Sequence, residues 1–208
     1  MRTLTPSLHA DFQVNARRFS RPLASLIDEI GPIGYQRRRT RDLGTHVARV
    51  IVGQQLSTLA ARAIWTRVET ATAGAPRPLE YCVEDRYPAL KACGLSNNKV
   101  KALIELRKAE LDGRLNARHL ARLPHLERSQ ALTALWGLGP WTADMVSMFY
   151  FHDHDIWPMG DLAVRKTFER FAAGHARYSL EAAAALFAPH RSFLALYMWR
   201  IANNGPDE

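Results

Sequence analysis

Nine residues decide the fold: Leu135-Trp136-Gly137-Leu138-Gly139-Pro140-Trp141-Thr142-Ala143. Apolar residues at helical spacing lie on both sides of this stretch, and a single residue separates its two glycines. Pro140 suits the first turn of a helix, because its nitrogen needs no hydrogen-bond partner there. The stretch therefore predicts a helix, a tight turn and a second helix that begins at once.

Gly137 and Gly139 leave the backbone of this turn open to a ligand. Glycine adopts positive φ readily and, lacking a side chain, lets a phosphate approach the main chain. The amides of the turn would then converge on the positive end of the second helix, which attracts anions. Such a site holds one DNA phosphate without reading sequence. In the alternative, the glycines serve only tight helix packing. A dinucleotide-binding motif is disfavoured, because no strand precedes them and its third glycine is missing.

Helical periodicity extends through most of the remaining chain. The helical ranges are 46–70, 90–111, 126–135, 142–151, 161–171, 180–187 and 191–202. Ser96 is expected to cap a helix after a break at 93–96. No segment sustains the two-residue alternation of a strand. We therefore expect an all-α fold of about nine or ten short helices.

The composition narrows the class of protein. The 208 residues carry 28 Lys and Arg against 20 Asp and Glu, and the net charge of +8 favours a polyanionic partner. The length predicts one domain or one compact two-lobed unit. No apolar run approaches the ~18–20 residues of a membrane span, and the N-terminus lacks the apolar core of a signal peptide. With only Cys82 and Cys93, neither a disulfide framework nor an iron–sulfur site is expected, which favours an intracellular protein.

The wider pattern resembles the helix-hairpin-helix superfamily of base-excision DNA glycosylases. The stretch Leu-x-Gly-Leu-Gly-x-Trp-Thr-Ala is similar to the hairpin of that family, which leads to a loop rich in Gly and Pro that ends in an Asp. Here the loop Trp157-Pro158-Met159-Gly160-Asp161 places the Asp 22 residues after Gly139. Further similar motifs lie at 51–57, 94–99, 189–192 and 197–200. The resemblance covers roughly residues 25–203 and is greatest to the alkylated-base branch, the 3-methyladenine DNA glycosylases of the second type.

The resemblance implies that Asp161 is the catalytic carboxylate. Cleavage of an N-glycosidic bond builds positive charge on the sugar, as in other glycoside hydrolyses. A carboxylate beside that sugar would stabilise the charge and orient or deprotonate the attacking water. Asp161 also directly precedes the apolar pattern that begins at Leu162, so it is predicted to be a helix N-cap. The two roles are compatible, because a helix N-terminus favours the ionised carboxylate. In the alternative, Asp161 is a cap only.

Trp141 stands where relatives that also cleave the DNA strand have a Lys nucleophile. Because an indole cannot form a Schiff base, the resemblance implies a hydrolase without AP-lyase activity. It also implies a base pocket of Trp141, Trp199 and Met145, the last at a position where some relatives have an aromatic residue. Alkylated purines are cationic, and cation–π attraction of about 0.5–2 kcal/mol would favour them in an aromatic pocket. In the alternative, Trp141 and Trp199 pack in the core. Trp136 and Trp157 are assigned to the core or to the rim of the pocket.

Extrusion of the target base from the duplex leaves a gap for the protein to fill. The resemblance assigns this task to the loop with Gln54, Gln55 and Leu56, which would enter from the minor groove. In the alternative, the glutamines satisfy backbone groups at a helix break. The expected DNA contacts are Gln54, Gln55, Leu56, Lys99, Gly137, Gly139 and Thr142.

No cofactor is expected for catalysis. His152 and His154 lie two residues apart in a predicted loop, without the further ligands of a zinc site. The family fold implies instead a structural Na⁺ or K⁺ ion at the hairpin. Its expected ligands are the backbone carbonyls of Thr133, Leu135 and Leu138.

Together these inferences predict a two-lobed helical bundle with the active-site cleft between its lobes. Residues 42–160 form the lobe with the helix-hairpin-helix, at about 128–151, and residues 1–41 with 161–208 form the other. The expected partner is damaged double-stranded DNA. A monomer would flip alkylated purines of the 3-methyladenine and 7-methylguanine type and excise them in base excision repair. Two alternatives stay open: a non-catalytic helix-hairpin-helix DNA-binding protein, and a glycosylase for deaminated or oxidised bases.

Overall fold

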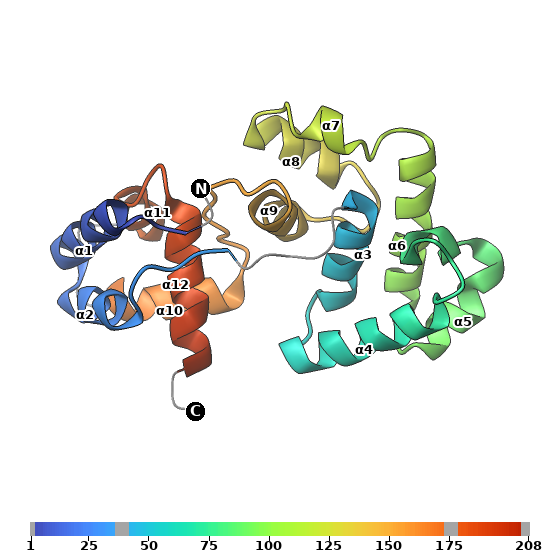
Figure 1. The fold of residues 1–208 in the computed structure, drawn as a ribbon, viewed down its shortest axis with the longest axis horizontal. Coiled ribbons are helices and arrows are strands. Elements are labelled where there is room, and N and C mark those ends of the chain that lie inside the picture. The colour runs from blue at the N-terminus through green and yellow to red at the C-terminus, as the bar shows by residue number, and fades with distance from the viewer. Residues whose placement is uncertain (1–2, 36–41, 173–178, 205–208) are drawn as a thin grey trace. The chain divides into compact units, whose positions relative to one another are not determined.

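All regular secondary structure in the described residues, 3–35, 42–172 and 179–204, is helical in the computed structural model (Figure 1). The β-type pairing within these ranges is an isolated bridge between Thr3 and Gly34. The prediction of an all-α fold is therefore confirmed. The described residues form twelve α-helices rather than nine or ten, because elements as short as α7 (Ala117–Leu120) show no periodicity. No helix in these ranges has the length and hydropathy of a membrane span.

The chain divides into two compact units, residues 38–151 and residues 1–37 with 152–208. The segment 152–160, which the sequence assigns to the hairpin lobe, belongs to the second of these units. Its backbone is bound to other parts of that unit. The hydroxyls of Tyr35 and Ser192 donate to the carbonyl of Asp153 at 3.0 and 2.8 Å, and the guanidinium of Arg191 binds both carboxylate oxygens of Asp155.

The unit of residues 38–151 is built around helix α3, which packs against α4, α6 and α9. Its apolar core is contributed by these helices and includes the fully buried Val47, Ile51, Leu103 and Val146. The helices are α3 (Leu43–Gly53), α4 (Thr58–Ala71), α5 (Tyr87–Ala92), α6 (Asn97–Leu111), α7, α8 (His125–Thr133) and α9 (Pro140–Phe149), with 3₁₀ turns η1 (Pro78–Tyr81) and η2 (Glu84–Arg86).

Short polar residues fix where the helices of this unit begin. Asp42, Ser57 and Ser96 accept hydrogen bonds from the first-turn amides of α3, α4 and α6. The predicted cap at Ser96 is thus confirmed. The helical range 46–70 is interrupted at residues 54–57, where Gln55 adopts a φ of +55°. This break places the loop of the candidate site.

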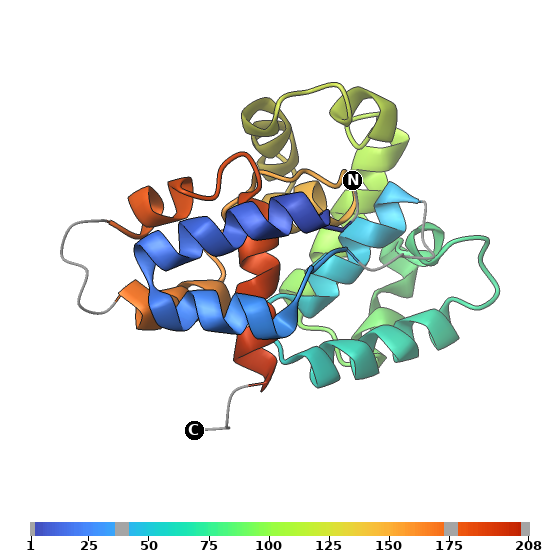
Figure 2. The same cartoon turned by 60° about the vertical axis from the view of Figure 1, so that its left-hand side comes forward.

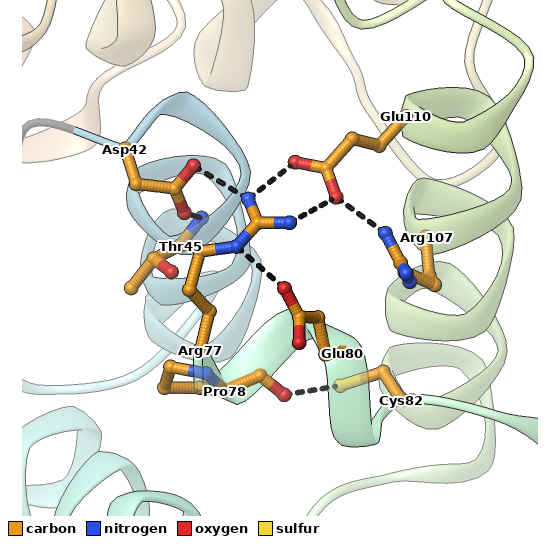
Figure 3. Close-up of polar contacts among 8 residues, drawn as sticks. All are labelled: Asp42, Thr45, Arg77, Pro78, Glu80, Cys82, Arg107 and Glu110. Carbon is orange, nitrogen blue, oxygen red and sulfur yellow. Dashed lines mark hydrogen bonds and ion pairs between the residues drawn. The ribbon is translucent and has the colours of Figure 1, made fainter. Parts of the chain in front are cut away.

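A partly buried charged network joins α3, η1 and α6 (Figure 3). The guanidinium of Arg77 donates to Asp42 at 2.8 Å, to Glu80 at 2.9 Å and to Glu110 at 2.9 Å. Arg107 adds a further hydrogen bond to Glu110 at 2.7 Å. Burial alone would raise the pKa of Asp42, but its hydrogen bonds and its ion pair with Arg77 together lower that pKa below the usual range.

The other unit comprises α1 (Pro6–Phe19), α2 (Arg21–Ile30), α10 (Leu162–Ala172), α11 (Leu180–Ala185) and α12 (Arg191–Asn204). Figure 2 shows α1 and α2 side by side, and α12 packs against α2, α10 and α11. Phe19 stacks on Phe168 at a ring distance of 5.1 Å in its core. The buried hydroxyl of Tyr197 donates to the carbonyl of Gly31 at 2.8 Å. Helix α12 therefore forms the centre of this unit and supports Trp199.

Candidate DNA-binding and catalytic site

The two glycines of the hairpin between α8 and α9 have different structural roles. Gly137 has a φ of +84°, and a Cβ atom added to it would lie 2.6 Å from the Cβ of Ala102 on α6. Both its conformation and its packing therefore require glycine. Gly139 has a φ of −101°, and an added Cβ would meet no described atom within 4 Å. Of the two glycines, Gly137 alone has a positive φ, and neither packing nor φ explains Gly139.

The first turn of α9 offers its backbone amides without a side-chain cap. Pro140 occupies the start of this helix as predicted, and Gly139 at the N-cap position supplies no capping side chain. The first-turn amides of an α-helix lack intrahelical partners and carry the positive end of the helix dipole. With open space beside Gly139, this helix start has the properties of an anion site.

Gln54 connects the turn after α3 to this hairpin. Its amide nitrogen Nε2 donates to the carbonyl of Gly137 at 3.1 Å and to Thr142 Oγ1 at 2.9 Å. Thr142 is buried, with 1% of its surface exposed, so its hydroxyl faces the protein rather than solvent. These contacts give Gln54 and Thr142, two of the predicted DNA contacts, an intramolecular role.

Lys99 of α6 reaches the same turn from another side. Its ammonium donates to the carbonyls of Val52 and Gln54, at 2.8 Å each. Lys99 is half-buried, and desolvation lowers the pKa of its ammonium below the ordinary value. The sequence suggests a DNA contact for Lys99, whereas the structure shows a bond to the protein's own backbone. Sequence spacing gives no signal for this contact, because 47 residues separate Lys99 from Val52.

The exposed tip of this turn is formed by Gln55 and Leu56. Leu56 has 39% of its surface exposed, and Gln55 is also exposed. The tip and the hairpin belong to the same unit, and Gln54 links them by hydrogen bonds. Residues predicted to contact DNA from two distant parts of the sequence are thus brought together.

The two predicted pocket residues of α9 differ in exposure. Trp141 is half-buried and Met145 is buried, with 6% of its surface exposed. Trp136, just before the hairpin glycines, has 42% of its surface exposed, and the ammonium of Lys101 lies 4.4 Å from its ring centroid. Trp136 is therefore a surface residue rather than part of the core.

Asp161 and Trp199 form a hydrogen-bonded pair in the other unit. One carboxylate oxygen of Asp161, Oδ1, accepts from the backbone amide of Val164 and from the indole Nε1 of Trp199, both at 3.0 Å. The first bond confirms Asp161 as the N-cap of α10. The second joins two predicted site residues that are 38 positions apart. Together the bonds fix the orientation of the carboxylate and the plane of the indole, and both residues are half-buried.

The structure gives no support for a transition-metal site. No group of three or more His, Cys, Asp or Glu side chains in the described residues is arranged to hold a metal ion. His154 lies between aromatic rings, with its ring centroid 6.4 Å from Tyr35 and 5.3 Å from Phe193. Cys82 and Cys93 are buried free thiols.

The hairpin carbonyls that are expected to hold a monovalent cation differ in their hydrogen bonds. The carbonyl of Leu135 accepts the amide of Leu138 at 3.2 Å. Among the described residues, no backbone amide outside the helices donates to the carbonyls of Thr133 or Leu138. Each carbonyl has two lone pairs, so all three retain capacity for a ligand.

Known proteins similar to this chain are DNA glycosylases. No protein-family model matches it. DNA-3-methyladenine glycosylase 1 of Schizosaccharomyces pombe is 27% identical over 157 residues, which are 73% of this chain and 69% of the relative. The structure of the 3-methyladenine DNA glycosylase Mag1 of that yeast with abasic DNA has a TM-score of 0.78 at 23% identity, covering 96% of this chain and 98% of Mag1.

A second solved structure gives a similar agreement. The DNA-3-methyladenine glycosidase of Bacillus halodurans has a TM-score of 0.75 at 25% identity, covering 98% of this chain and 94% of its own. The similarity to these proteins in sequence and in structure supports the placement of the chain in the helix-hairpin-helix superfamily of DNA glycosylases.

Proposed function

We propose that this protein is a 3-methyladenine DNA glycosylase that hydrolyses the N-glycosidic bond of alkylated purines in damaged duplex DNA. The observation that carries the proposal is the Asp161–Trp199 pair at the start of α10, with both donors on one carboxylate oxygen. A fixed carboxylate is what an oxocarbenium-like transition state requires. The named relatives, which are 3-methyladenine DNA glycosylases, support the same activity.

Asp161 would act on the sugar and Trp199 on the base. The carboxylate stabilises the positive charge that develops on the deoxyribose and orients the attacking water. The indole of Trp199, held by its own N–H to Asp161 at 3.0 Å, offers an aromatic surface to a cationic purine. The resemblance also assigns Trp141 and Met145 to the recognition of the base. A cationic purine is a good leaving group, so the protein needs little general-acid assistance.

The hairpin would hold the DNA while the base is extruded. The uncapped first turn of α9 and the open space beside Gly139 accept one phosphate. The exposed tip at Gln55 and Leu56 would fill the gap in the duplex. The protein would act as a monomer in base excision repair. A Na⁺ or K⁺ ion on the hairpin carbonyls would strengthen the grip on the phosphate by adding positive charge.

The proposal includes the absence of strand cleavage. A lyase needs an amine that attacks the sugar carbon and forms a Schiff base. Trp141 has no amine at the position from which strand-cleaving relatives supply one. The product should therefore be an intact strand with an abasic site.

The decisive test compares wild type with Asp161→Asn on methylated duplex DNA, with Glu169→Gln on the same helix as a matched control. Asparagine caps a helix about as well as aspartate, so the melting temperature should be retained. Loss of the carboxylate charge should lower 3-methyladenine release by on the order of 10²–10³-fold, whereas Glu169→Gln, at an exposed position, should not change it. Borohydride should trap no covalent adduct.

Each alternative function predicts a different result in that assay. A non-catalytic module would bind duplex DNA with a steep salt dependence and release no base. A glycosylase for deaminated or oxidised bases would release hypoxanthine, uracil or 8-oxoguanine and leave methylated purines in place. Release of methylated purines that is equal in wild type and Asp161→Asn would remove Asp161 from the catalytic role.

A further inference from the structure

Two side chains hold the turn between α3 and α4 in place. One comes from another helix and binds the turn, and the other belongs to the turn and binds the hairpin. Lys99 on α6 donates to the carbonyls of Val52 and Gln54. The side chain of Gln54 donates to Gly137 and Thr142 of the hairpin. Four hydrogen bonds of 2.8–3.1 Å thus connect α6, the turn and the hairpin within one unit.

The chemistry of the Lys99 contact fits the end of a helix. The last carbonyls of an α-helix lack intrahelical partners and carry its negative dipole end, which a cation stabilises. Val52 lies in the last turn of α3, and Gln54 follows that helix directly. An ammonium in a half-buried position loses hydration, and the two carbonyls replace water around it. Lys99 therefore restrains the backbone immediately before the exposed tip.

The tip has a backbone conformation that needs such restraint. Gln55 has a φ of +55°, in the left-handed region, which is unfavourable for a non-glycine residue. Its neighbour Gln54 is bound at its carbonyl by Lys99 and at its side chain by the hairpin. These hydrogen bonds restrain the backbone next to Gln55, and surrounding contacts of this kind are what allow a strained conformation to persist.

We propose that Lys99 and Gln54 are positioning residues, which hold the Gln55–Leu56 tip in a fixed place relative to the phosphate site of the hairpin. This inference rests on the proposed function. With the tip rigid, the phosphate grip and the insertion into the duplex happen as one event. Without it, the protein still binds DNA, but the tip no longer stabilises the extruded state.

The test measures single-turnover release of 7-methylguanine by Lys99→Met and Gln54→Leu. Each variant is assayed with the lesion paired to cytosine and with the lesion opposite an abasic-site analogue. Without an opposing base, extrusion costs less, because that cost is least for an unpaired base. Lys108→Met is the matched control, because Lys108 is an exposed lysine of the same helix that pairs only with surface carboxylates in the described structure. Gln55→Ala serves as the reference for loss of the tip.

On the paired lesion, we expect both variants to be slower by on the order of 10–100-fold, as for a misplacement of about 1 Å. Opposite the abasic analogue the loss should be less than about 3-fold, because little extrusion cost remains. Binding to undamaged duplex should change little, and a 2-aminopurine next to the paired lesion should show less unstacking. Gln55→Ala should give the same pattern, and Lys108→Met should resemble wild type.

Three results would overturn the inference. The logarithm of the DNA-binding constant falls linearly with the logarithm of the salt concentration. If the magnitude of this slope is smaller by about one for Lys99→Met, Lys99 is a direct phosphate ligand. An equal loss on both substrates would place the defect in chemistry or in folding, and the melting temperature separates these. Wild-type rates in both variants would remove the positioning role altogether. If the wild type itself releases no base, the proposed function fails, which is distinct from these three outcomes.

Discussion

At the scale of single residues, the hairpin depends on two glycines, whose missing side chains matter for different reasons. At Gly137 there is no room for a Cβ, because Ala102 occupies the space. At Gly139 the space for a Cβ is open. The sequence shows two glycines in a turn but does not show that they differ. The difference is visible only when α6 is seen against the hairpin, and it leads to opposite expectations for substitution.

Gly137→Ala should destabilise the protein, and Gly139→Ala should weaken DNA binding. A Cβ at residue 137 meets Ala102 at 2.6 Å on a backbone with positive φ, which should cost about 1–3 kcal/mol of unfolding free energy. At residue 139 a methyl group should change stability by less than about 1 kcal/mol, because φ is ordinary and space is open. Urea unfolding and fluorescence anisotropy with duplex DNA measure the two effects. Equal stability loss in both variants would contradict the assignment.

Local polar chemistry was predictable from the sequence, and long-range polar contacts were not. The caps at Ser96 and Asp161 and the helix start at Pro140 follow from local rules and are found in the structure. The bond from Trp199 to Asp161 and the bonds of Lys99 span 38 to 47 residues. No local pattern encodes such contacts. The resemblance places Trp199 near the flipped base, but it does not predict the bond to Asp161 or the bonds of Lys99 to the backbone.

At the scale of elements, helix α9 carries a carboxyl group in an unfavourable environment. Desolvation by burial raises the pKa of Asp144 to about 7. The nearest basic atom recorded for it is Nε2 of His125 on α8, at 3.5 Å. The hydrophobic side of α9 packs on α3 and α8, so this carboxyl is held against the protein rather than in water. Its charged form is disfavoured in the folded state.

Unfolding free energy should therefore fall as pH rises through 7. A folded-state pKa of about 7 lies above the value of 3.8 for an unperturbed Asp, so the stabilising contribution is complete at low pH and disappears above pH 7. Between pH 5 and pH 8 the loss due to Asp144 should be about 1–3 kcal/mol. In Asp144→Asn this component should be missing, as urea unfolding at both pH values would show. An unchanged pH dependence in Asp144→Asn would contradict the expectation.

The charged network of α3, η1 and α6 makes a second prediction at this scale. Arg77 forms ion pairs with Asp42, Glu80 and Glu110 at once, with 34% of its side chain exposed. Arg77→Leu should lower the unfolding free energy by about 1–2 kcal/mol, a value between those of exposed and buried ion pairs. Arg114→Leu breaks an exposed pair with Asp112 and should change it by less than about 0.5 kcal/mol. Thermal unfolding compares the two variants, and equal effects would show that the network adds nothing.

At the scale of the whole molecule, helical periodicity was sufficient to predict the fold class. The apolar positions of 46–70 and 90–111 recur at helical steps and became α3, α4, α5 and α6. The division into units was harder to place. Residues 152–160 follow the hairpin in sequence, but the bonds from Tyr35, Arg191 and Ser192 attach them to the unit of α12. Non-local contacts of this kind attach the segment to its unit, and the sequence therefore predicts the boundary later, at Asp161.

The catalytic role of Asp161 can be measured apart from DNA binding. Wild type and Asp161→Asn are compared for release of 3-methyladenine in a single turnover and for affinity toward a duplex with an abasic-site analogue. The carboxylate acts on the transition state, so release should fall by on the order of 10²–10³-fold while the dissociation constant changes by less than about 10-fold. Undiminished release by Asp161→Asn would contradict the catalytic role of Asp161. A loss of release that is explained fully by lost binding would also contradict it.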